Sequence, residues 1–358
     1  MAKIDAFFEL LNKQGGSDLH LISGLAPAIR VHGKMERVNY EVLTNNSLRA
    51  LIYEITPEEK IKVFEETGDV DYAYEVPGLA RYRGNLFMQR NGIGAVFREI
   101  PSKILTIDQL RMPSVLKKLA TLHKGLVLVT GPTGSGKSTT LAAIIDEANK
   151  IRQDHIITIE DPIEFVHESK GCIVNHREVG THTESFSKAL RASLREDPDI
   201  ILVGEMRDLE TISLALEAAA TGHLVFGTLH TQSASKTVDR VIDVFPADQQ
   251  AQIRTTLSES LKAVIAQTLF RKANQMGRVA VLEILMCTYA VGNLIRESKT
   301  FQLPSVIQTG KQLGMQSMDD GIMDLLTKRI IGPDEAYQKA FDKQKFVSFL
   351  RKAPDVLI

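Results

Sequence analysis

The alternation of apolar and polar positions changes character after about the first 100 residues. Before that point, short segments such as Ala28 to Val31, Val70 to Tyr74 and Ala95 to Arg98 alternate apolar with polar side chains. Glycine and proline separate these segments, and a helical stretch from Ser47 to Glu65 joins them. Because period-two alternation is typical of half-buried strands, the pattern predicts a small α+β domain.

A second pattern begins at Gly125. Four apolar runs, LVLVT, HIITIE, DIILVG and HLVFGTLH, alternate with helical stretches over residues 139–150, 186–194 and 209–221. Apolar runs separated by helices are typical of a parallel sheet that is covered on both faces. This part of the chain is therefore predicted to be a RecA-like α/β core.

Beyond about Pro246 the pattern becomes helical. Helices are predicted over residues 248–267, 290–298, 318–329 and 333–340. At roughly 150 residues per domain, a chain of 358 residues is expected to form two domains. They are assigned to residues 1–100 and 108–358, with a linker at residues 101–107 and a terminal helical subdomain over about residues 290–358.

Composition and charge narrow the class of protein. Apolar residues make up 44% of the chain and charged residues 24%, as in soluble globular proteins. The net charge of −1 provides no overall positive field for binding nucleic acid or an anionic membrane. No apolar run reaches the roughly 18 residues that a membrane span requires. The two cysteines, Cys172 and Cys287, form no CxxC pair, so a zinc site is not expected and a reducing cytoplasm fits.

The segment after LVLVT has the sequence of a P-loop. It reads GPTGSGKS, follows a predicted strand and opens a predicted helix, as this phosphate-binding motif requires. Backbone N–H groups of such a loop and the N-terminus of its helix bind phosphate. A glycine turn with an unoccupied lysine is the alternative. The predicted nucleotide-binding residues are Gly131, Pro132, Thr133, Gly134, Ser135, Gly136, Lys137, Ser138 and Thr139, with ATP and Mg²⁺ as cofactors and Ser138 as an Mg²⁺ ligand.

Carboxylates follow two of the predicted strands. Glu205 comes directly after IILVG, and ligands of parallel sheets gather at the carboxyl ends of strands. Glu205 is therefore predicted to orient or deprotonate the attacking water; a surface pairing with Arg207 is the alternative. Glu160 ends HIITIE and Glu164 follows four positions later; both are the predicted functional members of a second acidic group, with solvated turn carboxylates as the alternative. Glu164 and Glu205 are expected to reach Mg²⁺ through water.

Two histidines bound the run HLVFGTLH. His230 lies at its end and is predicted to reach the phosphate side of the sheet, whereas His223 lies at its start. Both are candidate functional residues, and a structural role is the alternative for each.

Arginines cluster in the first domain, in the segment RYRGNLFMQRNGIGAVFR. Tyr82 and Phe87 are interleaved with them, so an RNA-binding strand is one interpretation. The other interpretation is that these arginines are fingers donated to a neighbouring active site. The near-zero net charge of the chain favours this second interpretation. Solvated strand arginines are the remaining alternative. The predicted fingers are Arg81, Arg83 and Arg98.

The motifs GPTGSGKST, ITIEDPIEF, DIILVGEMRD and TGHLVFGTLHT, in this order and spacing, resemble the secretion ATPase superfamily and, within it, the PilT pilus retraction motors. The segments GGSDLHL and RYRGNLFMQRNGIGAVFR are similar to the N-terminal PAS-like domain and the arginine motif of the same family. The resemblance therefore extends over nearly the whole chain.

This resemblance implies a Walker A site at residues 131–138, an Asp box with Glu164, a Walker B carboxylate at Glu205 and a His box with His223 and His230. It also implies a homohexamer in which the PAS-like domain of one subunit packs on the core of the next and completes its nucleotide site with arginines. An inner-membrane platform protein is the implied partner, a paralogous retraction ATPase a further one, and nucleic acid is not expected. The implied location is the cytoplasmic face of the membrane.

Two features bear on which motor the chain resembles. Assembly and type II secretion ATPases usually carry a four-cysteine zinc subdomain, which two cysteines cannot supply, so retraction is favoured. Retraction motors commonly carry AIRNLIRE near the carboxyl end, where this chain reads AVGNLIRE with Gly292 in place of an arginine, on a helix expected at the surface. That change leaves open a PilU-like accessory motor or an ATP-binding assembly module.

Overall fold

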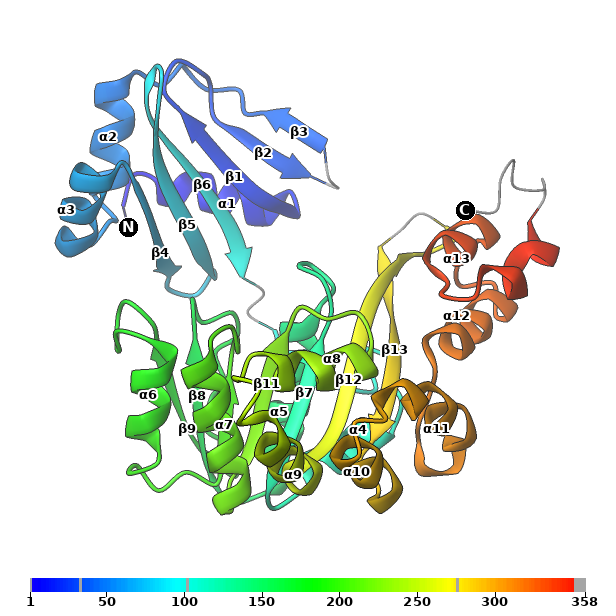
Figure 1. Ribbon diagram of the computed structural model, residues 1–358. Coiled ribbons are helices and arrows are strands. Elements are labelled where there is room, and N and C mark those ends of the chain that lie inside the picture. The colour runs from blue at the N-terminus through cyan, green and yellow to red at the C-terminus, as the bar shows by residue number, and fades with distance from the viewer. Residues whose placement is uncertain (1, 32–33, 101–102, 275–276, 351–358) are drawn as a thin grey trace. The chain divides into compact units, whose positions relative to one another are not determined.

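The structure, a computed structural model, describes residues 2–31, 34–100, 103–274 and 277–350. The chain divides into two compact units, Met1–Lys103 and Ile104–Ile358, each with a sheet of its own (Figure 1). Within the linker expected at residues 101–107, residues 101 and 102 lie outside the described part of the chain.

The first unit is a six-stranded antiparallel sheet with three helices. Its strand order is β3-β2-β1-β6-β5-β4. The single helix predicted from Ser47 to Glu65 is two helices, because Pro57 lacks an N–H group and stands between them. The elements are α1 Asp5–Lys13, β1 Gly16–Ile22, β2 Ala28–Val31, β3 Lys34–Arg37, α2 Asn45–Tyr53, α3 Glu58–Thr67, β4 Asp69–Val76, β5 Ala80–Gln89 and β6 Gly92–Ile100.

Aromatic rings form the centre of this unit's core. Phe8 from α1 stacks on Tyr82 of β5 at 4.2 Å between ring centroids and meets Phe97 of β6 edge-on at 5.1 Å. Tyr82 is fully buried, and alternate residues of β5 point into the core. Arg81 and Arg83 therefore lie on the opposite face of the sheet.

The second unit is built on a seven-stranded sheet with the order β13-β12-β7-β11-β10-β8-β9. All neighbouring strands are parallel except β12 and β13, which are antiparallel. The strands are β7 Gly125–Thr130, β8 His155–Glu160, β9 Ile173–Glu178, β10 Ile200–Val203, β11 Leu224–Leu229, β12 Leu261–Arg271 and β13 Arg278–Met286. The four strands expected between residues 125 and 230 are thereby confirmed.

Helices cover both faces of this sheet (Figure 1). Alternate residues of β7 enter two separate cores: Leu126 and Leu128 enter one, and Val127 and Val129 enter the other. The fold is therefore the predicted RecA-like α/β core. The helices are α4 Val115–Ala120, α5 Lys137–Ile151, α6 Phe186–Ser193, α7 Leu209–Thr221, α8 Ala234–Asp243, α9 Gln250–Ser260, α10 Tyr289–Arg296, α11 Leu303–Thr309, α12 Met318–Thr327 and α13 Pro333–Lys339, with short 3₁₀ turns η1 Thr300–Gln302, η2 Lys311–Leu313 and η3 Lys343–Phe349.

The helix predicted over residues 248–267 is wrong in its second half. Helix α9 ends at Ser260, and the apolar run that follows is strand β12, which pairs with β7 and with β13. A short apolar run fits a buried strand and a buried helix equally well, so periodicity alone does not separate them. Strands β9 and β13 were not predicted either.

The last helices form a small core of their own. Residues from α12, α13 and η3 pack against Phe270 of β12 and Val281 of β13. In the part of the chain that the structure describes, none of the helices combines the length and the apolar character of a membrane span.

A buried carboxylate forms ion pairs with arginines on the outer face of the first unit's sheet. Asp18 of β1 is 4% exposed and accepts a hydrogen bond from Nε of Arg98 at 2.8 Å, with Nε of Arg30 at 3.7 Å. Burial raises the pKa of Asp18, but hydrogen bonds from Ser17 and Arg98 outweigh burial, and its pKa is lowered overall. The ionised form therefore stabilises the fold.

We expect the stability supplied by Asp18 to depend on pH. A carboxyl group whose pKa is lower in the folded state stabilises the fold above its unfolded pKa, and this contribution is lost as pH falls through the folded pKa. Asp18→Asn should therefore destabilise the chain by about 1 kcal/mol at pH 7. This difference from wild type should shrink as the pH is lowered toward 3, measured by thermal unfolding of both proteins.

Asp71→Asn is the control, because the Asp71 side chain is half exposed and its ion pair with Arg83 is long, at 3.8 Å. It should change the unfolding midpoint little. A destabilisation by Asp18→Asn that is the same at every pH would contradict the assignment.

Candidate functional site

The loop between β7 and α5 has the backbone of a phosphate-binding loop. Gly131, Gly134 and Gly136 have φ angles of 144°, 76° and 86°, in a region that side chains with a Cβ rarely adopt. A Cβ on Gly131 would lie 2.3 Å from the carbonyl oxygen of Gln267. Glycine is therefore required at these turns, and the loop leads directly into the first turn of α5.

Lys137 lies across this loop. Its Nζ donates to the carbonyl oxygens of Gly131 at 3.0 Å and Pro132 at 3.3 Å. Burial lowers the pKa of Lys137, while the negative charges of Glu205 and Glu164 act in the opposite direction. The lysine and both predicted carboxylates are thus close enough to interact electrostatically.

Glu205 follows β10 and has two cationic or hydrogen-bonding partners. Its Oε1 lies 2.6 Å from Nε2 of His230 and also forms an ion pair with Arg207. Burial raises the pKa of Glu205, but the hydrogen bonds from Arg207 and His230 outweigh burial and lower it. The structure therefore combines the strand-end position that we predicted with the Arg207 pairing that was the alternative.

Glu160 and Glu164 occupy different environments although they lie four residues apart. Glu160 ends β8 and is 8% exposed, and its Oε2 accepts a hydrogen bond from the backbone N–H of Glu164 at 3.2 Å. Burial raises the pKa of Glu160 to about 7. The Glu164 residue is exposed. Glu160 is thus not the solvated turn carboxylate of the alternative; it holds the loop that carries Glu164.

The two histidines lie at opposite ends of β11. His230 follows the strand on the P-loop side, whereas His223 precedes it, with its Nδ1 3.0 Å from the carbonyl oxygen of Ala218 at the end of α7. Six strand residues separate the two by roughly 20 Å. His223 therefore does not contribute to the phosphate site of its own chain, and its predicted contact with nucleotide does not fit that site.

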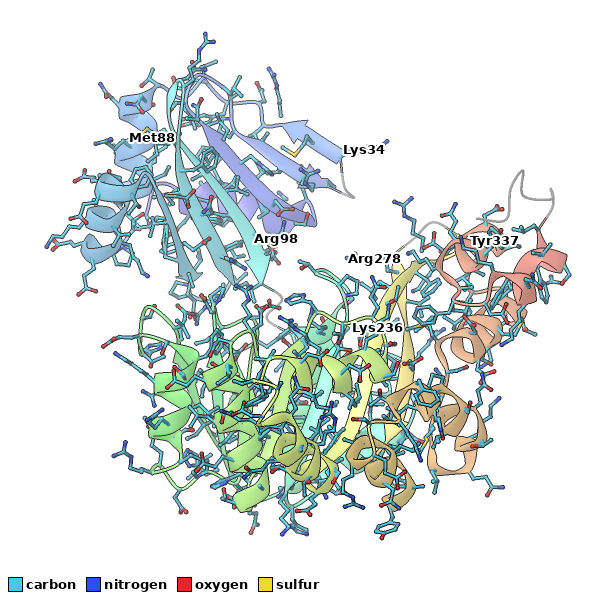
Figure 2. The ribbon with its side chains drawn as sticks, viewed as in Figure 1. Lys34, Met88, Arg98, Lys236, Arg278 and Tyr337 are labelled. Atoms are coloured by element: carbon cyan, nitrogen blue, oxygen red, sulfur yellow. The ribbon has the colours of Figure 1, made fainter. Side chains whose placement is uncertain are left out.

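The predicted arginines belong to the first unit and lie on one face of its sheet. Arg83 of β5 is directly opposite Arg98 of β6, and Arg98 is directly opposite Asp18 (Figure 2 labels Arg98). Arg81 precedes Arg83 by two positions and shares its face. Each of the two arginines has a carboxylate partner on this face: Arg98 pairs closely with Asp18, and Arg83 pairs with Asp71 over a longer distance of 3.8 Å.

Tyr82, which suggested an RNA-binding strand, lies in the core of the first unit and is fully buried. It is therefore closed to stacking on a base. Phe87 is only partly buried, but a single ring is a weaker argument for single-stranded nucleic acid than two.

Gly292 is not at the surface as we expected. It is buried on α10 and faces α9, where a Cβ would lie 3.0 Å from the carbonyl oxygen of Ser258. A side chain at this position requires α9 to give way by a few tenths of an ångström. The substitution at this position therefore concerns helix packing.

One polar residue near the P-loop was missed altogether. Gln267 of β12 is 2% exposed and hydrogen-bonds to Ser135 and Thr140. Sequence reasoning placed it in a helix. The signal that could have revealed it is a lone amide within the otherwise apolar run AVIAQTLF.

The chain is similar to known proteins over most of its length. Residues 96–331 match the family described as type II/IV secretion system protein. The chain is 58% identical to the type IV pilus retraction ATPase PilT of Pseudomonas aeruginosa, over 93% of this chain and 97% of that protein. It is 39% identical to the type IV pilus ATPase PilU of the same organism, over 94% of this chain and 88% of that protein.

Among solved structures, a crystal structure of the pilus retraction motor PilT with bound ADP superposes with a TM-score of 0.90 at 43% identity. The match covers 96% of this chain and 98% of that one. Both the fold and the sequence of nearly the whole chain are thus shared with these proteins. The chain belongs to the type II/IV secretion system protein family.

Proposed function

We propose that this chain is the ATP-hydrolysing subunit of a hexameric motor that drives type IV pilus retraction. The proposal rests on one observation. At the carboxyl edge of one parallel sheet, Lys137 lies within electrostatic reach of Glu205 and Glu164, and Glu205 contacts His230. The similarity to PilT over nearly the whole chain supports the choice of pilus retraction as the process.

The P-loop residues bind the phosphates of ATP, and the ammonium group of Lys137 contacts the β- and γ-phosphates. Glu205 accepts a hydrogen bond from the attacking water. Because its pKa is lowered, Glu205 stays ionised at neutral pH and is a weak base, so its main task is to orient the water. His230, 2.6 Å from Glu205, holds the carboxylate in place.

The residues around the P-loop fit Mg²⁺. The hydroxyl of Ser138 would hold the ion, and Glu164 and Glu205, whose charges already act on Lys137, would reach it through water. When bound, Mg²⁺ neutralises negative charge on the transferred phosphoryl group.

The exposed arginines of the first unit complete the site of a neighbouring subunit in this proposal. Arg83 and Arg98 lie opposite one another, and the long ion pair of Arg83 with Asp71, at 3.8 Å, leaves the Arg83 guanidinium available to a phosphate. Arg81 lies on the same face. A ring of identical subunits at the cytoplasmic face of the membrane, acting on a platform protein of the pilus, follows from this assignment.

The higher identity to PilT than to PilU favours a principal retraction motor over an accessory one. The position of Gly292 agrees, because a buried contact between α9 and α10 is not a surface for coupling to a partner. The alternative is an assembly module that binds ATP but hardly hydrolyses it. Measurements of ATP turnover distinguish the two.

Glu205→Gln should lower ATP turnover by about 10²- to 10⁴-fold and leave ATP binding intact, because the amide keeps the size of the side chain but loses its charge. Turnover and equilibrium binding of ATP are measured on the same preparation. The matched control is Glu210→Gln, which removes an exposed carboxylate of α7 that pairs with Arg191. If the wild-type protein hardly hydrolyses ATP, or hydrolyses it no faster than the Glu205→Gln variant, the ATP-binding module is favoured.

A mixing experiment tests whether arginines are donated between subunits. Lys137→Ala removes the P-loop lysine, and Arg83→Ala removes a finger worth about 10³-fold or more in rate. Each variant alone should be inactive. Rings co-expressed from both should regain activity, because the intact P-loop of one subunit receives Arg83 from the other.

Arg37→Ala serves as the control in this experiment, since Arg37 is exposed on the edge strand β3 and should not affect turnover. Mixed rings that assemble but stay inactive would contradict donation between subunits.

Deletion of the gene in a strain without paralogous retraction ATPases should increase surface pili and abolish twitching motility. Complementation with the wild-type gene should restore both, and complementation with the Glu205→Gln variant should not. Unchanged twitching after deletion would refute retraction as the function, and full rescue by the Glu205→Gln variant would refute hydrolysis as its energy source.

A further inference from the structure

A single buried amide joins the P-loop to the neighbouring strand. Gln267 lies on β12, one position beyond Ala266, which pairs with Thr130 at the end of β7. Its side chain is 2% exposed, its Nε2 donates to the carbonyl oxygen of Ser135 at 2.6 Å, and its Oε1 accepts from Oγ1 of Thr140 at 2.5 Å. It thus contacts both the loop and the first turn of α5.

The orientation of this amide is determined by its partners. A backbone carbonyl oxygen can only accept, so the group that faces Ser135 must be the NH₂. The oxygen of Gln267 then faces Thr140, whose hydroxyl can donate to it. Both polar ends of a fully buried side chain are therefore satisfied only in this arrangement.

The contact with Ser135 has a consequence for phosphate binding. In a trans peptide, the C=O and the following N–H point in opposite directions. When Nε2 of Gln267 holds the carbonyl of Ser135 on the β12 side, the N–H of Gly136 points away from β12. A P-loop binds phosphate through such inward-pointing N–H groups.

We propose that Gln267 is a positioning residue of the P-loop, which holds the peptide between Ser135 and Gly136 so that the N–H of Gly136 is directed at the bound phosphate. This inference rests on the proposed nucleotide-binding function of the loop. Gln267 itself does not touch the nucleotide.

The glycines of the loop show how closely β12 approaches. A Cβ on Gly131 would lie 2.3 Å from the backbone oxygen of Gln267, and a Cβ on Gly136 would lie 2.9 Å from its Nε2. Two of the three P-loop glycines therefore leave room for the same residue. The loop is shaped around Gln267.

The strand that carries Gln267 is itself held firmly. Two and four positions further along, the carbonyl of Leu269 accepts from Nζ of Lys339 at 2.7 Å, and the N–H of Arg271 donates to Glu335 at 3.0 Å. Phe270 is fully buried in the core of the last helices. A rigid support of this kind is what a positioning residue requires.

The first test replaces the amide by a shorter, apolar side chain that can neither donate nor accept a hydrogen bond. Gln267→Leu should weaken ADP binding by about ten- to a hundred-fold, because the peptide at Ser135 loses its donor and is free to turn. ADP affinity is measured by equilibrium titration of the full chain, alongside thermal unfolding without nucleotide.

Gln316→Leu is a matched control, since Nε2 of Gln316 donates to the carbonyl oxygen of Leu282 at 2.7 Å. Leu282 is the cross-strand partner of Gln267, so this variant loosens the same strand pair but keeps the donor to Ser135. It removes a similar hydrogen bond and should lower the unfolding midpoint without changing ADP affinity. If Gln267→Leu binds ADP as tightly as the Gln316→Leu variant, the proposal is overturned. If wild type itself fails to bind ADP, the proposed function fails instead.

The second test uses pH and does not depend on the apolar variant folding. In Gln267→Glu, the protonated carboxyl group can donate to Ser135 and accept from Thr140 as the amide does, whereas the ionised group has no donor. Burial raises the pKa of such a carboxyl group. The ratio of variant to wild-type ADP affinity should therefore rise at least tenfold as the pH falls from 9 to 6, a factor that corresponds to about 1.4 kcal/mol. A ratio that is constant with pH would overturn the proposal.

Discussion

The candidate site depends on one constraint, the parallel register of β7, β11, β10 and β8. Leu229 pairs with Thr130, and Val203 pairs with both Gly227 and Ile159, so these strands end at a common edge. The residues that follow the strand ends are then neighbours in space, although they are up to 100 positions apart in sequence. Burial of both faces of the sheet keeps the strands from shifting relative to one another.

That rule explains how much of the site could be predicted. The positions of the P-loop, Glu205 and His230 follow from the ends of recognisable strands, and the contact between Glu205 and His230 is the outcome. The same rule places His223 at the start of β11, away from the P-loop. The nucleotide-binding role that family resemblance implied for His223 therefore does not fit the P-loop of the same chain.

What could not be predicted depends on contacts that are not local. The run that forms β12 has no pattern that separates it from a helix, and it becomes a strand because β7 and β13 lie on either side of it. The partners of Gln267 are more than 120 positions away in sequence. Gly292 likewise looked like a surface position until α9 was seen to pack on it. In each case the deciding neighbour comes from a distant part of the chain.

Strand β12 gives these separate findings a common physical basis. Within five residues, from Gln267 to Arg271, it contacts the P-loop, the core of the last helices and α13. These five residues are all paired with β13, so a shift at one of these contacts is passed along the strand to the others. The loop that holds phosphate and the helices at the end of the described chain therefore share one support, and neither can move far without straining the bonds of the other.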